Sequence, residues 1–417
     1  VDRVITNISL KYKINSWLDL QARGNIDKSL NDLNYNSYAT TSLKQSGANG
    51  GYDFGRFINT QLYGDLILNA NRELTTDLSL SATIAAGIND DRGIYSQFST
   101  EQTGDGLRFA NIFTLANILP SNFNVSDGSS HSQSQAVFAT TQLNFKDYLY
   151  LDLTGRNDWS SAFAFTPVEK KGYFYYSAGL TAVLSEMLRM PAAISYSKVR
   201  VSYAKVGNSV PSYRTNPPAY YINNQTGSYP NTSGPKPGTY LKPEDNRSFE
   251  VGTEWSFANN RFGFDFTYYI NNNFRQYIAI PVSGSSTGNL STWYLNSGNI
   301  KNNGVELSVY ATPVRTRALS WTTTFNFASN KNEVVNISDA ALGVSQKYVV
   351  LTGLSNNMYG SYITEGGSWG DIYGYFFKKD ANGAIVVDDD NVPIKGEEPS
   401  TVLGNPSVKK LGNPNPD

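Results

Sequence analysis

The sequence contains no cysteine and only one histidine, His131. The absence of cysteine excludes a disulfide framework and thiolate metal sites. A single imidazole also excludes a metal centre built from several histidines. We therefore predict no metal site, and no sequence motif indicates a cofactor.

Charged residues are scarce, at 17% of the chain, against about 25% in ordinary soluble proteins. The net charge is -1, so a basic surface for nucleic acid is not expected. No apolar run reaches the roughly 18 residues of a membrane-spanning helix. Aromatic residues, in contrast, make up 13% of the chain. The membrane architecture that this composition still allows is a β-barrel.

Helical periodicity is almost absent, and alternation with a period of two recurs along the chain. Within residues 17–27, one face carries Leu18, Leu20, Ala22, Gly24 and Ile26, and the other carries Asp19, Gln21, Arg23 and Asn25. This alternation is typical of a strand with one apolar and one polar face. Similar segments lie near 4–12, 58–68, 78–86, 137–145, 149–155, 172–184, 198–206, 249–257, 262–270, 305–311 and 319–327. The sequence thus predicts an all-β fold of about twelve antiparallel strands, long enough to cross a bilayer at a tilt.

The predicted connections alternate between short and long. Short turns are expected near 13–16, 71–74, 146–147, 259–261 and 312–318, and a slightly longer connection, with one helical turn before Pro191, at 185–197. Long connections rich in Gly, Ser, Asn and Pro are expected near 28–54, 89–133, 157–171, 207–245, 281–299 and 331–370. A soluble β-sandwich has no reason to place every long loop at one end. Outer-membrane barrels do, because their periplasmic turns are short and their extracellular loops long.

The second face of the predicted strands is polar. It carries Asp19, Arg23, Asp65, Asp152, Arg156, Arg200, Glu250, Glu254, Asp265 and Glu306. In a membrane barrel the apolar face contacts lipid, so these charges would line the lumen. A polar lumen implies water, a polar solute or a polar plug.

Possible catalytic motifs have simpler explanations. The segment GSSTG at 284–288 matches a nucleophile elbow, but that motif needs a following helix and a histidine base. Glu250 and Glu254 share a strand face and could form a glycosidase pair, but a role as lumen-facing polar residues explains them more simply. Residues 379–383, KDANG, are typical of an Asn-Gly hairpin turn. We therefore predict no catalytic residue and no enzymatic activity.

Aromatic residues in or beside the long connections are the candidate ligand- or partner-contacting residues. They are Phe109, Phe113, Trp159, Tyr213, Tyr220, Tyr221, Tyr229, Trp293, Tyr294 and Trp369. Flat aromatic rings suit sugars, peptide side chains and partner proteins. The alternative is that the loops use these rings to pack on themselves.

Several motifs resemble one family. They are YLYLDLTGRNDWSS (148–161), RVSYAKVGN (200–208), LKPEDNRSFEVG (241–252), NSGNIKNNGVEL (296–307) and LGNPNPD (411–417). In this order they resemble the barrel of SusC/RagA-type TonB-dependent outer-membrane transporters. The resemblance implies nutrient import across the outer membrane of a Gram-negative, Bacteroidetes-type bacterium. It also implies a SusD-like surface lipoprotein as partner, TonB acting through regions outside this chain, and contact with outer-membrane lipid. Expected substrates are oligosaccharides, or oligopeptides in some members.

The resemblance also sets expectations for the extent of the domain. Residues 1–417 would form part of one multi-pass outer-membrane β-barrel of about 22 strands. The plug domain and the C-terminal strands would be absent from this chain. Two other classes remain open from the sequence: a surface-binding adhesin without transport, and a barrel-borne hydrolase. The strict alternation of connections favours the importer over the adhesin, and the missing catalytic constellation disfavours the hydrolase.

Overall fold

The computed structural model describes residues 1–42, 46–100, 106–217, 221–224, 227–230, 233–236, 238–283, 290–337, 348–355, 359–397 and 407–413. No helix within these residues is long and apolar enough to cross a membrane. The described chain consists mostly of strands, and the pairs β1–β2, β2–β3, β7–β8, β8–β12, β12–β13, β13–β14 and β14–β15 are antiparallel. The predicted all-β antiparallel fold is confirmed.

One large sheet contains all the long strands. They are β1 (Asp2–Lys13), β2 (Leu18–Ser37), β3 (Gly51–Thr75), β4 (Leu78–Thr100), β5 (Phe123–Phe145), β6 (Leu149–Ser160), β7 (Tyr173–Val183), β8 (Ile194–Asn208), β12 (Glu244–Phe257), β13 (Phe262–Ser283), β14 (Leu290–Arg315) and β15 (Ser320–Asn336). Consecutive strands are neighbours, and β8 is followed by β12. The two-residue strand β11 (Gly234–Pro235) pairs with β14 in parallel and completes a 13-stranded sheet. The strand count expected from the sequence is confirmed.

Smaller elements occupy the connections. The helices are η1 (Leu115–Asn117), η2 (Pro120–Asn122), η3 (Ser161–Phe163), α1 (Pro167–Lys171) and α2 (Leu184–Met187), and β9 (Tyr221–Asn224) forms a hairpin with β10 (Gly227–Pro230). Helix α2 is the helical turn predicted before Pro191. A second sheet contains β16 (Tyr348–Ser355), β17 (Tyr359–Thr364), β18 (Asp371–Tyr375) and β19 (Val408–Gly412). The expectation of a plain loop at 331–370 was therefore wrong, because strands this short carry too few alternations to be recognised.

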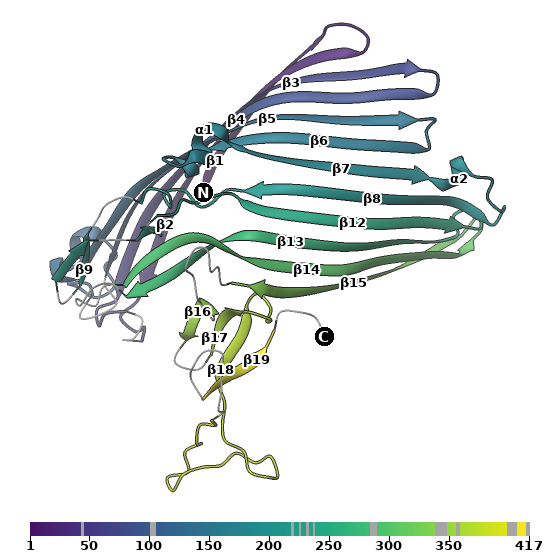
Figure 1. The fold of residues 1–417 in the computed structure, drawn as a ribbon. Coiled ribbons are helices and arrows are strands. Elements are labelled where there is room, and N and C mark those ends of the chain that lie inside the picture. Colours follow the sequence, from purple (N-terminus) through teal and green to yellow (C-terminus); the bar gives the residue numbers. More distant parts are fainter. Residues whose placement is uncertain are drawn as a thin grey trace. The chain divides into compact units, whose positions relative to one another are not determined.

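The chain divides into two compact units. Unit 1 comprises Val1–Ala70, Thr83–Phe138 and Asp158–Ser161, and unit 2 comprises Asn71–Ala82, Ala139–Asn157 and Ala162–Asp417. In unit 2, strands β7, β8, β12, β13, β14 and β15 lie side by side, and the small sheet β16–β19 follows the last of them (Figure 1).

The strand register of unit 1 gives its part of the sheet two chemically distinct faces. Across β2 and β3, Leu20 is opposite Leu68, and Arg23 is opposite Asp65. Because successive side chains of a strand point to opposite faces, the leucine pair and the charged pair lie on different faces. The apolar and polar faces predicted from the sequence are both present.

Unit 2 has the same two faces. Val201 of β8 is opposite Val251 of β12, which is opposite Tyr268 of β13. On the other face, Glu254 is opposite Asp265. The apolar row is exposed, with 38% of Val201 and 41% of Val251 accessible. An extended exposed apolar surface of this kind suits hydrocarbon rather than water.

Backbone hydrogen bonds connect the short turns of unit 2 into one rim. They join Lys146 N–H to the Asp77 carbonyl (2.8 Å), Val183 to Tyr148 (2.7 Å), Ala258 to Ala193 (2.9 Å) and Thr312 to Arg261 (2.7 Å). Each bond connects one short turn to the next, so these turns share one end of the strands. This is the arrangement expected of short turns on one side of a membrane.

Several strands extend much farther than the sequence predicted. β3 has 25 residues and β14 has 26, whereas crossing a bilayer requires about 9–11. The expected loop 28–54 shrinks to the residues between Ser37 and Gly51, the expected loop 281–299 is mostly strand, and the turn expected at 71–74 lies at 76–77. Beyond the bilayer neither face has to be apolar, so the alternation that reveals a strand is lost. Tyr35 opposite Asp53 illustrates these mixed extensions.

The apolar core of unit 2 lies among the long connections. Its main cluster contains Ala162, Phe163, Val210, Leu241 and Tyr294. Phe163 is 0% exposed and Leu241 1%. These residues come from η3, two loops and β14, so the loops are packed against one another and against the end of a strand.

The two faces should respond differently to charge. Leu151 belongs to the apolar row of β6 and Thr154 to its polar face. Arginine facing lipid at mid-bilayer costs about 2–4 kcal/mol, whereas a lumen-facing arginine remains hydrated. We expect Leu151→Arg, introduced into the complete reading frame, to reduce the amount of protein assembled in the outer membrane. The matched variant Thr154→Arg should assemble normally, and equal yields would contradict the assignment of faces.

Candidate functional site

The polar face of unit 1 carries a hydrogen-bonded row of side chains across β2 and β3. The guanidinium of Arg23 donates to Asp65 Oδ1 (2.9 Å), and the hydroxyl of Tyr63 donates to Asp65 Oδ2 (2.6 Å). Four residues farther along each strand, the Asn69 side chain donates to Asp19 Oδ1 (3.1 Å). The Asp65 side chain is 3% exposed, but that of Arg23 is 46% exposed. Hydrogen bonds between neighbouring side chains thus hold this row in place, while the Arg23 guanidinium remains accessible to a solute.

The polar face of unit 2 carries a comparable network. Arg200 donates to both carboxylate oxygens of Asp265 (2.9 and 3.1 Å) and to the Thr267 hydroxyl (2.6 Å). Lys198 forms an ion pair with Glu254 at 2.6 Å. The structure therefore brings together residues that the sequence analysis had placed only on a common face. The ion pair gives Glu254 a basic partner on the polar face.

A cavity of about 520 Å³ opens on the polar face of unit 1. Its neutral polar lining comprises Ser29, Asn31, Asn59, Thr60, Gln61, Ser130 and Ser132. The ion pair of Arg3 and Asp27, with Nε to Oδ1 at 2.8 Å, also lines it. Hydroxyl and amide groups both donate and accept hydrogen bonds, so this lining suits a solute rich in such groups.

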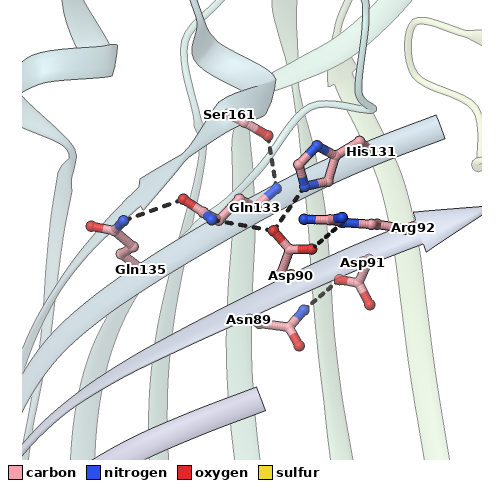
Figure 2. Close-up of polar contacts among 8 residues, drawn as sticks. All are labelled: Asn89, Asp90, Asp91, Arg92, His131, Gln133, Gln135 and Ser161. Atoms are coloured by element: carbon pink, nitrogen blue, oxygen red, sulfur yellow. Dashed lines mark hydrogen bonds and ion pairs between the residues drawn. The ribbon is translucent and has the colours of Figure 1, made fainter. Parts of the chain in front are cut away.

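The single histidine belongs to a polar cluster centred on Asp90 (Figure 2). His131 Nε2 lies 2.7 Å from the Asp90 carboxylate, which also accepts from Arg92 Nε (2.8 Å) and Gln133 Nε2 (3.2 Å). Asp90 is only 8% exposed. Because side chains alternate along a strand, Asp90 shares a face with Ile88, two residues earlier in β4. The charged cluster therefore lies on the apolar face, next to the apolar row of β4. A nearly buried carboxylate beside apolar side chains needs several hydrogen-bonding partners, and His131, Arg92 and Gln133 supply them.

The connection between β4 and β5 contains two of the predicted site residues. Phe113 is partly buried and packs edge-on against the Tyr38 ring, with centroids 5.1 Å apart. Phe109 is 62% exposed and Ile112 is 51% exposed. The buried Asn117 side chain donates to the carbonyls of Phe109 (2.8 Å) and Ile112 (2.7 Å) and so fixes the segment. Phe113 is therefore used within the loop, while Phe109 and Ile112 form an exposed apolar patch.

Trp159 and Tyr213 differ in their surroundings. Trp159 lies in β6 and is partly buried, lining a shallow groove of about 380 Å³ together with Leu66, Ile88 and Val137. This groove belongs to the apolar face, so Trp159 is better placed for lipid than for a lumenal ligand. Tyr213 lies in the connection after β8 and is 45% exposed.

Trp293 and Tyr294 lie in β14, not in a loop as the sequence suggested. Tyr294 is 8% exposed, and its hydroxyl accepts from Arg214 at 2.9 Å. Its ring stacks on Tyr277 at 5.9 Å, and burial raises the pKa of Tyr277, near the loop end of β13, to about 12. Trp293 is partly buried beside another apolar cluster. Both predicted site residues thus contribute to packing.

The remaining aromatic candidates divide into packed and undescribed side chains. Trp369 packs against a cluster that includes Val334 and Ile363, and its backbone N–H donates to Asn332 Oδ1 at 2.6 Å. Tyr221 and Tyr229 lie in the hairpin β9–β10, but the structure describes only their backbone. Tyr220 lies outside the described residues. A ligand- or partner-contacting role for the ten aromatics stays a prediction.

The other motifs have limited support. The predicted Asn-Gly turn is confirmed, since Gly383 has φ 85 and Asp380 N–H donates to the Ala384 carbonyl at 2.9 Å. The GSSTG segment at 284–288 lies outside the described residues. Among the residues that the structure describes, no three His, Cys, Asp or Glu side chains gather as a metal site would require.

Comparison with known proteins identifies the family. A family model described as "TonB dependent receptor-like, beta-barrel" matches residues 2–401. The chain belongs to this family. Its members are outer-membrane barrels, in agreement with the apolar face and with the rim of short turns.

Individual relatives support this assignment. TonB-dependent receptor P26 of Formosa agariphila is 26% identical over 246 residues, covering 56% of this chain and 24% of P26. TonB-dependent receptor SusC of Bacteroides thetaiotaomicron is 28% identical over 114 residues, covering 27% of this chain and 11% of SusC. The structure of the RagAB peptide transporter has a TM-score of 0.71 at 15% identity, covering 99% of this chain and 44% of that one. The predicted SusC/RagA resemblance is confirmed, and the chain spans less than half the length of these relatives.

The sequence analysis missed several residues of the TonB-dependent barrel. Lys198 was not assigned to the polar face, and Asp90, Arg92 and Gln133 were not associated with His131. A signal was available, because Asp90 and Arg92 are two residues apart, as are His131 and Gln133, and such residues share a strand face. Their convergence, however, requires the register between β4 and β5, which the sequence does not provide.

The packing of Tyr294 generates a stability prediction. Truncating a buried aromatic side chain costs about 3–5 kcal/mol. We expect Tyr294→Ala to loosen the connection between β8 and β12, so that protease cleaves it faster on intact cells while the barrel remains assembled. Tyr240→Ala serves as the control, since Tyr240 lies in the same connection and is 44% exposed. Mass spectrometry locates the cleavage sites, and equal rates for the wild type and Tyr294→Ala would show that the cluster does not hold the connection.

Proposed function

We propose that the chain forms part of the barrel of a TonB-dependent importer in the outer membrane of a Bacteroidetes-type bacterium. The supporting observation is a polar face with hydrogen-bonded charges and a cavity, on strands whose other face is apolar. When the apolar face contacts lipid, the polar face lines an aqueous lumen through which a polar solute can pass. Transport, rather than enzymatic activity, is the role that this arrangement supports.

The chain would supply one part of a single barrel domain. It covers 44% of the RagAB chain in the structural match, which leaves room for a plug domain and further strands in a longer protein. A barrel that holds a plug requires about 22 strands. TonB would act through those other regions, driven by the proton gradient of the inner membrane.

Oligosaccharides are the proposed substrates. The lining of the 520 Å³ cavity is dominated by serine hydroxyls and by asparagine and glutamine amides, which match the hydroxyl groups of sugars. Oligopeptides are the second candidate. They are supported by the ion pair of Arg3 and Asp27 at the same cavity and by the structural match to a peptide transporter.

A SusD-like surface lipoprotein is the proposed partner. The exposed patch of Phe109 and Ile112 lies in a connection held in place by Asn117, so it presents a fixed apolar surface. Such patches on an otherwise polar surface often mark protein contacts.

The substrate proposal predicts the effect of changing one residue of the cavity. Gln61 lines the cavity, whereas Gln135, on the apolar face of β5, does not. Loss of one solute hydrogen bond costs about 0.5–1.5 kcal/mol, so Gln61→Leu should weaken binding by about 2–10-fold. We expect slower uptake of labelled oligosaccharide with Gln61→Leu and unchanged uptake with the matched variant Gln135→Leu.

Three outcomes would change this conclusion. Uptake of labelled oligopeptide but not oligosaccharide would favour the second candidate. Binding without uptake, unaffected by a protonophore, would indicate an adhesin rather than an importer. Equal uptake by Gln61→Leu and Gln135→Leu would remove the cavity from the transport path.

The partner proposal predicts a separate phenotype. The double variant Phe109→Ser and Ile112→Ser removes the exposed apolar patch without touching Phe113 or Asn117. We expect normal barrel assembly but reduced co-purification of the lipoprotein, because the patch no longer buries apolar area. The exposed pair Phe377→Ser and Ile385→Ser, in the hairpin before β19, is the control. Full association of the lipoprotein with the first variant would show that the patch is not the contact.

A further inference from the structure

A second charged cluster, in unit 2, has a buried carboxylate at its centre. Asp245 accepts from Arg247 (2.9 Å) and Arg275 (3.0 Å), and Lys205 lies 3.7 Å away. The Asp245 side chain is 4% exposed, whereas those of Arg247 and Arg275 are 47% and 43% exposed. One carboxylate therefore positions three cations whose charged ends remain accessible.

The register places this cluster on the apolar face. Lys205 is opposite Arg247, two residues beyond the pair Tyr203 and Phe249 of the apolar row. β8 begins at Ile194, so Lys205 lies eleven residues along the strand from the rim of short turns. Because about 9–11 residues cross a bilayer, the cluster lies at the level where the outer leaflet meets water.

A cavity of about 280 Å³ adjoins the cluster. Four cations line it, Lys171, Lys205, Lys242 and Arg275, against the two carboxylates Glu244 and Asp245. Neither Lys171 nor Lys242 has a carboxylate partner among the residues that the structure describes. The cavity therefore has excess positive charge that the protein itself does not neutralise.

Aromatic residues lead from the cavity along the apolar face. Phe174 lines the cavity and is 60% exposed. Its ring stacks with that of Tyr176 at 6.2 Å, and Tyr176 lies 6.3 Å from the ring of Tyr203. Leu180 continues the row in β7 and is 43% exposed. A ligand that fits this site has an anionic group for the lysines and hydrocarbon chains for the row beneath them.

We propose that this cavity binds the phosphate group of a phosphorylated, acylated glycolipid of the outer leaflet. The inference rests on the proposed placement of the chain in the outer membrane. Lysine and arginine are effective phosphate ligands, and basic residues at a membrane surface attract anionic headgroups. The acyl chains would lie along Phe174, Tyr176 and Leu180. The site thus recognises a membrane lipid and is separate from the polar face that the transported solute would contact.

The test compares two lysine pairs in the complete protein reconstituted into nanodiscs. Monophosphoryl lipid A or its dephosphorylated form is titrated in, and bound lipid is measured by native mass spectrometry. Lys171→Gln with Lys242→Gln should weaken binding of monophosphoryl lipid A by about tenfold or more, the combined effect of two membrane-surface lysines. The dephosphorylated lipid should be little affected. Lys378→Gln with Lys379→Gln, which removes the same charge from the exposed hairpin, should leave binding unchanged.

Several results would overturn the proposal. They are equal affinity of the wild type and the Lys171/Lys242 variant, an equal loss for the dephosphorylated lipid, and the same loss in the hairpin control. If the Lys171/Lys242 variant loses the lipoprotein but keeps the lipid, the occupant is an acidic protein surface instead. Oligosaccharide uptake is measured in the same strains and separates the two proposals. If the wild type prefers the phosphorylated lipid but takes up no oligosaccharide, only the proposed function is contradicted.

Discussion

A backbone N–H or C=O group in hydrocarbon has no water to bond to, so the protein must satisfy each such group itself. The strands of this chain meet that requirement by long, continuous pairing. β12 and β13 pair without interruption from Asp245–Phe274 to Phe257–Phe262. The short turns continue the bonding from one hairpin to the next. Once the register is fixed, alternation of side chains leaves only two faces, and the chemistry of each is determined by what it contacts.

The two faces handle charge in different ways. On the polar face, Arg200 and Asp265 pair while both side chains remain over a third exposed, as water in a lumen permits. On the apolar face, Asp90 and Asp245 lie where apolar rows end, and both carboxylates are almost buried. Asp90 and Asp245 each gather several donors. An unpaired buried charge is expensive, so a carboxylate beside lipid requires this fuller coordination.

The sequence predicted the membrane-crossing parts of the fold well, because lipid forces the period-two pattern there. It failed where that constraint ends. The extension of β14 containing Trp293 and Tyr294 was predicted to be a loop, because its packing depends on Arg214, 80 residues away, and on Tyr277 of the adjacent strand β13. The same limit applies to the candidate site. Alternation places Arg200 on the polar face, but its bond to Asp265 requires the register of three strands.

The strand extensions also explain why the polar cavity lies on paired strands rather than on loops. Ser29 and Asn59 are opposite each other in the register of β2 and β3, and Asp27 is opposite Gln61. The conformational entropy of these groups is lost when the sheet forms, not when a solute arrives. Preorganised donors and acceptors therefore retain more of their interaction energy for binding. Among the loop aromatics that the structure describes, Phe113 and Phe163 are packed, whereas Phe109, Phe165, Tyr213 and Tyr240 are exposed.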